Sequence, residues 1–358
     1  MIGSLHGQKV NLWVGANPFH RLERSNVASL RGAFQHEHGT MDVPVHPQLP
    51  VFAPDQCRAH HADAQVVLLQ QDLVVARCSL WWTQVPALPG QRLGIIGHFA
   101  TTAAPASCEL LAAACTELRQ HGVTLAVGPM DGTTWRRYRL LTERGPEPPF
   151  FLEPDNPDDW PEGFLAAGFT PLAGFFSALN DDLTIEDPRI PRTVARLENS
   201  GVTFRALQPG AFRAELERIY AVSRLSFQSN FLYTPLAEAD FIAQYEPIRA
   251  HIRPELVILA EHQSRAVGFV FAIPDLAQAR RGQVVDTVVL KTVAVLPGRT
   301  YAGLGNVLVA KCQQAARAQG FRRVIHALMH ERNNSLNLSG HYARPFRRYT
   351  LYSRLLLP

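Results

Sequence analysis

The stretch Thr292-Val-Ala-Val-Leu-Pro-Gly-Arg-Thr-Tyr-Ala-Gly-Leu-Gly-Asn-Val-Leu-Val309 decides the fold of this chain. A buried-strand pattern ends at Pro297, a short loop carries Gly303 and Gly305, and a helical pattern follows at once. Glycine lets the backbone approach a ligand closely and adopt a positive φ. Because the first N–H groups of a helix lack partners, the stretch predicts a pyrophosphate site. It is neither a Walker loop nor a dinucleotide fingerprint, since no Gly-Lys-Ser/Thr and no third glycine follows.

The pattern around this stretch occurs twice in the chain. In the second half, a hairpin at 257–261 and 266–273 precedes a strand at 284–296, a helix at 304–319 and a strand at 324–329. In the first half, strands at 65–69 and 73–80 precede a strand at 92–99, a helix at 107–121 and a strand at 123–128. The offset of about 197 residues predicts two copies of one α/β unit.

Clusters of proline, glycine and acidic residues, which favour turns and loops, divide the chain into four parts. We expect an N-terminal arm at 1–50, a first copy at 51–180, a linker at 181–200 and a second copy at 201–358. The stretch from Arg348 to Leu356 predicts the closing strand of the second copy.

Composition excludes several classes of protein. With 46% hydrophobic and 18% charged residues, the chain is not disordered. No run of 18 apolar residues predicts a membrane span, and no charged start with an apolar core predicts a secretory signal, so we expect a cytoplasmic protein. The five cysteines form no CxxC, which argues against a disulfide framework, and we predict no metal site.

The stretch resembles the signature of the GNAT superfamily of acyl-CoA-dependent N-acyltransferases. That signature is a strand ending in Val-x-Pro, then Arg/Gln-x-x-Gly-x-Gly/Ala opening a helix, and Gly303 and Gly305 stand six and eight residues after Pro297. The resemblance covers 201–358 well and about 60–180 faintly. It implies an α/β (α+β) fold of two GNAT-like domains, each a mixed, mostly antiparallel twisted sheet flanked by helices. Because the segment between Phe99 and Ser107 has no glycine, we expect the first copy to be degenerate and non-catalytic.

The resemblance also implies a cofactor site. Backbone groups of Val293, Ala294 and Val295 would pair with the pantetheine arm, and Asn333 would contact it. The pyrophosphate would be held by Arg299 and by the amides of Thr300, Tyr301, Ala302, Gly303, Leu304 and Gly305. The sequence departs from the family pattern here, because Thr300 stands where the family has Arg or Gln and Arg299 comes one residue earlier.

Acyl transfer to an amine requires a base, because an alkyl ammonium has a pKa near 10.4, and the leaving thiol benefits from an acid. The family's tyrosine position, counted from Asn333, is Gly340, so we expect nearby Tyr342 to be the acid. His330, at the end of the strand 324–329, and the adjacent Glu331 are the candidate bases. His326 is a second candidate or a satisfied buried histidine. Lys291 shares a strand face with Val293 and Val295, and it either contacts an acyl or phosphate group or simply snorkels.

These inferences predict an N-acyltransferase that uses acetyl-CoA or a longer acyl-CoA. The acceptor is an amine of a small molecule or a peptide, and the aromatic residues at 212–245 favour a hydrophobic acceptor or a longer acyl chain. An acyl carrier protein as donor, and a non-catalytic acyl-CoA sensor or scaffold, remain alternatives. A nucleic-acid binder is the least favoured, although 311–358 carries nine basic residues and one acid, because no recognition helix is evident.

Overall fold

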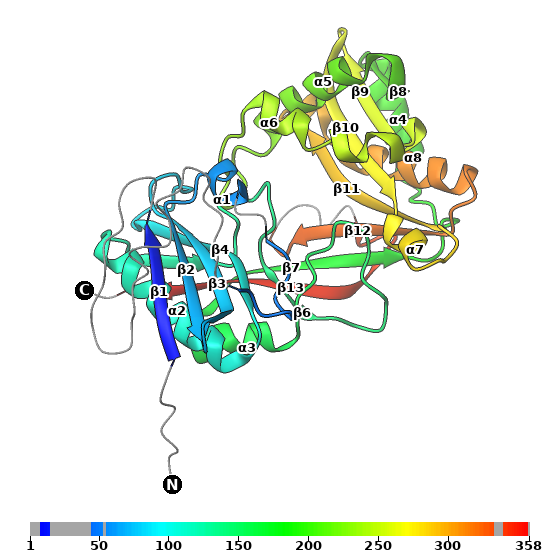
Figure 1. The fold of residues 1–358 in the computed structure, drawn as a ribbon. Helices are drawn as coiled ribbons and strands as arrows, with labels where there is room; N and C mark the ends of the chain where they lie inside the picture. The colour runs from blue at the N-terminus through cyan, green and yellow to red at the C-terminus, as the bar shows by residue number, and fades with distance from the viewer. Residues whose placement is uncertain (1–7, 15–43, 53–54, 333–338, 357–358) are drawn as a thin grey trace. The chain divides into compact units, whose positions relative to one another are not determined.

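The computed structural model describes residues 8–14, 44–52, 55–332 and 339–356. The chain forms two compact units (Figure 1). Unit 1 comprises Met1–Thr142, Pro154–Ala173 and Thr350–Pro358, and unit 2 comprises Glu143–Glu153 and Gly174–Tyr349. The division falls inside two long strands, β7 (Thr170–Asn180) and β13 (Arg344–Leu355), so each of these strands contributes residues to both units.

Unit 1 contains a mixed sheet covered by helices. Strands β1 (Gln8–Val14), β2 (Ala64–Gln70), β3 (Leu73–Trp81) and β4 (Leu93–Thr101) pair antiparallel in chain order, and β5 (Leu125–Gly128) lies parallel to β4. The end of β13 pairs antiparallel with β5, from Tyr352 opposite Gly128 to Leu355 opposite Leu125. Helix α2 (Ala104–Gln120) connects β4 to β5, and α3 (Asp159–Ala166) packs on α2. Two short elements in this region are α1 (Asp55–Ala59) and β6 (Leu140–Glu143).

Unit 2 contains the second sheet. Strands β8 (Val202–Ala206), β9 (Val257–His262), β10 (Arg265–Pro274) and β11 (Thr287–Val295) pair antiparallel in this order. Strand β12 (Arg323–His330) lies parallel to β11, and β7 pairs antiparallel with β12. The helices are α4 (Ile190–Asn199), α5 (Phe212–Ser226), α6 (Glu238–Ala243), α7 (Leu276–Arg280) and α8 (Leu304–Ala318), with 3₁₀ turns at Pro209–Ala211, Glu246–His251, Pro254–Leu256 and Arg299–Tyr301.

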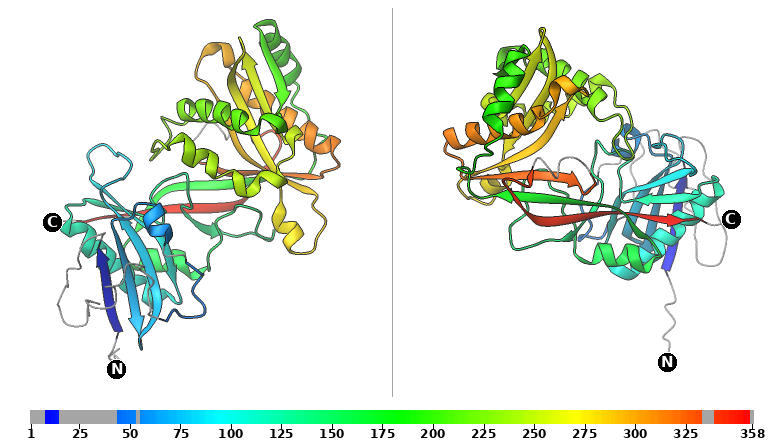
Figure 2. Two further views of the ribbon diagram at one scale, coloured as in Figure 1. Left: turned by 45° about the horizontal axis from the view of Figure 1, so that its top comes forward. Right: turned by 180° about the vertical axis from the view of Figure 1, so that it is seen from behind.

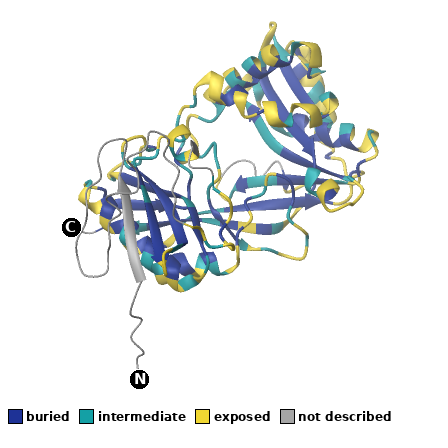
Figure 3. Cartoon of the chain, in the orientation of Figure 1, coloured by how far each residue is buried: buried dark blue, intermediate teal, exposed yellow. Residues whose placement is uncertain are grey.

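Helices cover both faces of this second sheet. Helices α4 and α8 pack together on one face, and α5 with α6 covers the other (Figure 2). The strands between them are buried, whereas the outward sides of the helices are exposed (Figure 3). None of the described helices is long and apolar enough to cross a membrane.

The repeat predicted from the sequence is confirmed by the topology of the two units. In unit 1 the order is β2, β3, β4, α2 and β5, and in unit 2 it is β9, β10, β11, α8 and β12. In each unit the first two strand pairs are antiparallel and the pair joined by the helix is parallel. The expected mixed, mostly antiparallel sheets flanked by helices are therefore present.

Two details of the predicted organisation differ from the structure. The final strand, expected to close the second copy, instead ends beside β5 of unit 1, while β7 from the first half of the chain lies next to β12. The expected linker at 181–200 contains α4, whose Leu197 is fully buried. Pro191 lies in the first turn of this helix, where proline removes no hydrogen bond, so it does not mark a break.

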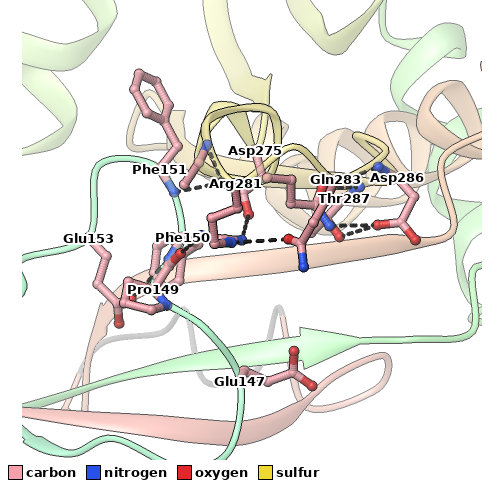
Figure 4. A network of polar contacts seen from close by, with 12 residues as sticks. Glu147, Pro149, Phe150, Phe151, Glu153, Asp275, Arg281, Gln283, Asp286 and Thr287 are labelled. Carbon is pink, nitrogen blue, oxygen red and sulfur yellow. Dashed lines mark hydrogen bonds and ion pairs between the residues drawn. The ribbon is translucent and has the colours of Figure 1, made fainter.

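A polar network connects residues 143–153 to the rest of unit 2 (Figure 4). The N–H of Phe151 donates to the Asp275 carboxylate at 2.7 Å, and Arg281 donates to the carbonyl oxygen of Pro149 at 2.7 Å. The guanidinium of Arg347 pairs with Glu153 at 2.8 Å with both side chains fully buried. A cavity of about 360 Å³ lies in this region, but its charged groups pair with one another, so we do not assign it a ligand.

Candidate active site

Over its second half, strand β11 pairs with β10 along one edge and no longer pairs with β12 along the other. Its parallel ladder with β12 ends at Leu290 opposite His326, whereas its ladder with β10 continues to Val295 opposite Gly268. Among the described residues, no strand therefore pairs with the other edge of 291–295. An extended ligand with amide groups can add to such an edge as a further strand. The predicted contacts of Val293, Ala294 and Val295 require this arrangement.

Both strands depart from regular geometry where the parallel ladder stops. On β11, Lys291 is an extra residue between the pairs Leu290–Ala272 and Thr292–Phe271. On β12, Leu328 has a φ of 59°, and the register with β7 shifts between His326 and Met329. Because a bulge bends the strand that carries it, these two bulges account for the parting of β11 from β12.

The glycine loop follows β11 directly. Gly298 has a φ of 144°, Arg299–Tyr301 form a 3₁₀ turn, and Gly303 has a φ of 78° and caps α8. A side chain at Gly303 would lie 2.9 Å from the Thr193 methyl group. The first backbone hydrogen bond of the helix runs from the N–H of Val307 to the Gly303 carbonyl. The N–H groups from Gly303 to Asn306 are therefore open to an anion.

The loop is held from α4 and from β9. Arg196 of α4 donates to the carbonyl oxygen of Thr300 at 3.2 Å and also to that of Ala302. The Tyr301 hydroxyl lies 3.0 Å from His262 Nδ1. These contacts direct the loop carbonyls toward the protein. Sequence reasoning missed Arg196 because it lies in the expected linker, although its place in the last turn of a helical segment was visible.

Tyr342 places a buried hydroxyl in the same unit. Its ring belongs to the apolar cluster that contains Leu304 and Val307 of α8. The hydroxyl lies beside the backbone of Asp187, yet no group among the described residues satisfies it with a hydrogen bond. Burial raises the pKa of this phenol. Because this hydroxyl makes no well-formed hydrogen bond to a described residue, its proton is available to a ligand.

The other predicted acid–base residues are more engaged. His330 lies between the rings of Phe175 and Phe231, with centroid distances of 4.9 and 5.9 Å. Its Nδ1 accepts the N–H of Arg332 at 3.0 Å, so the neutral ring carries its proton on Nε2. The Glu331 carboxylate pairs with Arg348 at 2.7 Å. Asn333, predicted to contact pantetheine, lies outside the described residues.

His326 is a satisfied buried histidine, which was one of the two interpretations of its sequence position. Its Nδ1 lies 2.7 Å from the Ser339 hydroxyl and its Nε2 lies 3.3 Å from the Gln313 amide. Burial lowers its pKa to about 4. The imidazole is therefore neutral near pH 7 and connects β12 to α8.

An aromatic surface borders His330. The segment after α5 carries Phe231, which is 37% exposed, and Leu225 at the end of α5 is 42% exposed. Tyr245 lies buried against Phe271 of β10, with ring centroids 5.0 Å apart. Apolar side chains are therefore available on the face that α5 and α6 cover.

The corresponding edge in unit 1 is closed. The N–H of Met130 donates to the Ile96 carbonyl at 2.8 Å, and Asp131 accepts the N–H of His98 at 2.6 Å. A side chain at Gly97 would lie only 1.9 Å from the Met130 carbonyl oxygen, so the backbones are in close contact. Pro105 in the first turn of α2 supplies no N–H. The described residues of unit 1 thus form neither a free edge nor an anion cradle like those of unit 2.

Several solved structures are similar to this chain at low sequence identity. A GCN5-related glucosamine N-acetyltransferase region of a fungal multi-domain GH3 β-N-acetylglucosaminidase gives a TM-score of 0.49 at 15% identity, covering 81% of this chain and 33% of that chain. A GCN5-related N-acetyltransferase from Sphaerobacter thermophilus gives 0.47 at 13% identity, covering 82% and 81%. A tandem GNAT protein from the clavulanic acid biosynthesis pathway gives 0.44 at 14%, covering 82% and 83%.

Sequence comparisons are more specific. A bacterial ceramide synthase from Caulobacter vibrioides is 28% identical over 226 residues, which is 61% of this chain. The chain spans 58% of the length of that relative. The model of the acetyltransferase (GNAT) family matches residues 216–338, which contain the one-sided strand β11 and the glycine loop. Residues 216–338 therefore form a domain of the acetyltransferase (GNAT) family.

Proposed function

We propose that the chain is an N-acyltransferase that moves an acyl group from coenzyme A to an amine. The observation that carries the proposal is the continuous backbone surface formed by the free edge of 291–295 and the open N–H groups of 303–306. An acyl-CoA presents amides and a diphosphate in the same order. Family members use acyl-CoA as a co-substrate, which supports this assignment.

The residues present fit such a donor. The N–H groups at the start of α8 would hold the diphosphate, and the exposed Arg299 stands on the loop beside them. The β11 edge would pair with the pantetheine amides, and one of its N–H groups would polarise the thioester carbonyl. The unsatisfied hydroxyl of Tyr342 would supply a proton to the departing thiolate.

We further propose that the acceptor is a long-chain amine and that the acyl chain is long. Two observations support this. The relative from Caulobacter vibrioides is a ceramide synthase, and a ceramide is the amide of a fatty acid with a long-chain amino alcohol. The acceptor side of unit 2 exposes apolar groups at Leu225 and Phe231.

The basic C-terminal region gives the nucleic-acid alternative little support. Arg323, Arg344, Arg347 and Arg348 pair with Glu147, Asp181, Glu153 and Glu331, respectively. Four of the nine basic residues of this region are therefore paired with carboxylates within unit 2.

The deciding experiment uses the full chain with acyl-CoAs from C2 to C16. Thermal shifts first identify donors, because stabilisation follows ligand concentration over Kd. Release of CoA and formation of the amide are then measured with a long-chain amino alcohol, with glucosamine and with a lysine peptide. Amide formation that is fastest with the amino alcohol supports the proposal. Binding of acyl-CoA without turnover on any amine would favour a sensor, and turnover only from an acyl carrier protein would change the donor.

A further inference from the structure

We propose that the amine of Lys291 is the base that removes the proton from the acceptor ammonium. This rests on the proposed function and names a residue for its proton transfer. The geometry that carries it is the position of Lys291 in the bulge where β11 leaves β12, with its side chain directed to the α5–α6 face.

The side chain of Lys291 is placed by its contact with Tyr245. The Nζ atom lies 4.8 Å from the centre of the Tyr245 ring, which follows α6. Lys291 is also the first residue of β11 beyond the last pair with β12. Its amine therefore lies on the acceptor side of the sheet, at the start of the edge assigned to the donor. A base in an acyl transfer must lie within hydrogen-bond reach of the incoming ammonium group, on the side from which the acceptor enters.

The surroundings of Lys291 allow it to be neutral. No ion pair or hydrogen bond of its amine is found among the described residues, and burial alone lowers its pKa to about 8. Tyr245 faces it from the loop after α6 and stays neutral because burial raises its pKa. No charged group on β10, β12, α5 or α8 acts on its titration. Near pH 8 a neutral Lys291 amine is therefore available to accept a proton.

That this position carries a lysine rather than an arginine also supports the proposal. Only Lys9, Lys291 and Lys311 are lysines among 35 basic residues, and the rest are arginines. A guanidinium remains protonated at any accessible pH, whereas a desolvated lysine releases its proton readily. A lysine with no anionic partner is thus suited to proton transfer rather than to charge pairing.

The lone pair of the Lys291 amine takes one proton from the acceptor ammonium, and the freed amine forms the C–N bond with the thioester carbonyl carbon. The C–S bond breaks and its electron pair leaves with the thiolate. The attacking nitrogen loses its second proton to give the neutral amide, and the thiolate takes up one proton in its place. Lys291 returns its own proton to water, so that each turnover releases one proton.

The test compares Lys291→Met and Lys291→Arg with Lys311→Met. Lys311 is a matched control, because its Nζ lies 4.6 Å from the Phe204 ring in the same unit. We expect both Lys291 variants to lose about 10²–10³-fold in kcat with the long-chain amino alcohol at pH 7.5. Their Kd for acyl-CoA, measured by calorimetry, should stay within about twofold, and Lys311→Met should match the parent protein.

A pH profile gives the readout that a structural role would not move. The parent protein should show a limb in kcat/KM near the lysine pKa of about 8. This limb should disappear in Lys291→Met, whose rate should rise toward high pH as the acceptor amine loses its own proton. Circular dichroism establishes that each variant is folded, and Lys291→Gln replaces Lys291→Met if that variant unfolds.

Three results would overturn the inference while leaving the proposed function intact. These are full activity of a folded Lys291→Met, retained activity of Lys291→Arg, and a mass spectrum of the parent protein with the acyl group on Lys291. Absence of acyl-CoA binding by the parent protein, or of any amide product, would instead overturn the proposed function and this inference with it.

Discussion

His98 in β4 and Lys291 in β11 each lie in a bulge, one in each of the two copies. Each lies where one strand of the antiparallel ladder gains a residue over its partner, on the strand that precedes the connecting helix. In unit 1 the N–H of His98 is bonded to Asp131, and the Ile96 carbonyl accepts from Met130. In unit 2 the corresponding edge beyond Leu290 is open. The two copies share a topology and differ in whether this edge is available.

This difference predicts one molecule of CoA per chain. Unit 2 offers the free edge and the anion cradle, whereas unit 1 has neither. Isothermal titration of the full chain with CoA should therefore give a stoichiometry near one. A stoichiometry of two would contradict the assignment of unit 1 as closed.

Gly303→Ala should weaken CoA binding at least tenfold while leaving the chain folded. The new methyl group would meet Thr193 at 2.9 Å and displace the loop that carries the open N–H groups. The positive φ of 78° adds a backbone cost of about 1–2 kcal/mol for a residue with a Cβ.

Gly320→Ala is the matched control for this change. Gly320 follows the other end of α8 and has a φ of 85°, and a methyl group added there would meet no atom within 4 Å. It should lose a similar free energy of unfolding and keep its affinity for CoA. Calorimetry and urea unfolding measure the two quantities. Equal affinity for CoA in both variants would contradict the assignment of the diphosphate site to the start of α8.

Arg196→Met should raise the Kd for acyl-CoA about tenfold, which corresponds to about 1.4 kcal/mol. The guanidinium of Arg196 fixes the carbonyls of Thr300 and Ala302, and without it the loop samples other conformations. Arg213→Met is the control, because Arg213 pairs with Glu217 at 3.2 Å on the exposed side of α5, away from the loop. An unchanged Kd for acyl-CoA in Arg196→Met would show that the loop keeps its conformation without the Arg196 guanidinium.

Local patterns were sufficient for the strands and helices around the site. The hairpin of β9 and β10, strand β11 and helix α8 follow from apolar periodicity and from glycines at their ends, all within about 70 residues. Partners that are distant in the sequence could not be predicted in this way. Nothing local indicates that β7 lies beside β12 or that β13 ends beside β5, because each strand has the same alternating pattern in either position.

The candidate site was predictable to a similar extent. The glycine loop is a local motif, whereas the state of each titratable group depends on its tertiary neighbours. Glu331 resembles a free carboxylate in the sequence, but Arg348 neutralises it across 17 positions. The lack of a carboxylate near Lys291 among the described residues also could not be predicted from the sequence, because it depends on the tertiary neighbours of the side chain.

Tyr342→Phe should leave the free energy of unfolding unchanged or slightly increased. Removing a buried hydroxyl that makes no well-formed hydrogen bond to a described residue relieves a desolvation cost. If Tyr342 donates the proton to the thiolate, kcat should fall by about 10²-fold or more while the Kd for acyl-CoA stays similar.

Tyr349→Phe provides the contrast. The Tyr349 hydroxyl contacts Ser177 at 3.1 Å and also donates to Glu153, so its removal should cost about 1–3 kcal/mol of stability. Thermal unfolding and steady-state rates of both variants test the pair. A Tyr342→Phe enzyme with full kcat would eliminate Tyr342 as the acid.

Acid should destabilise the chain below about pH 6.5, in part through His326. Burial lowers the pKa of His326 to about 4, whereas an unfolded histidine titrates near 6.5. Between these values the unfolded state binds more protons, so the free energy of unfolding falls as the pH falls. From pH 7 to pH 5 this group contributes a loss of about 2 kcal/mol. His326→Gln, which can still bond to Ser339, should be less stable at pH 7 but should show a correspondingly shallower pH dependence in urea unfolding followed by circular dichroism. An unchanged slope in this variant would assign the acid sensitivity to other groups, such as the buried His98 of unit 1, whose pKa burial lowers to about 3.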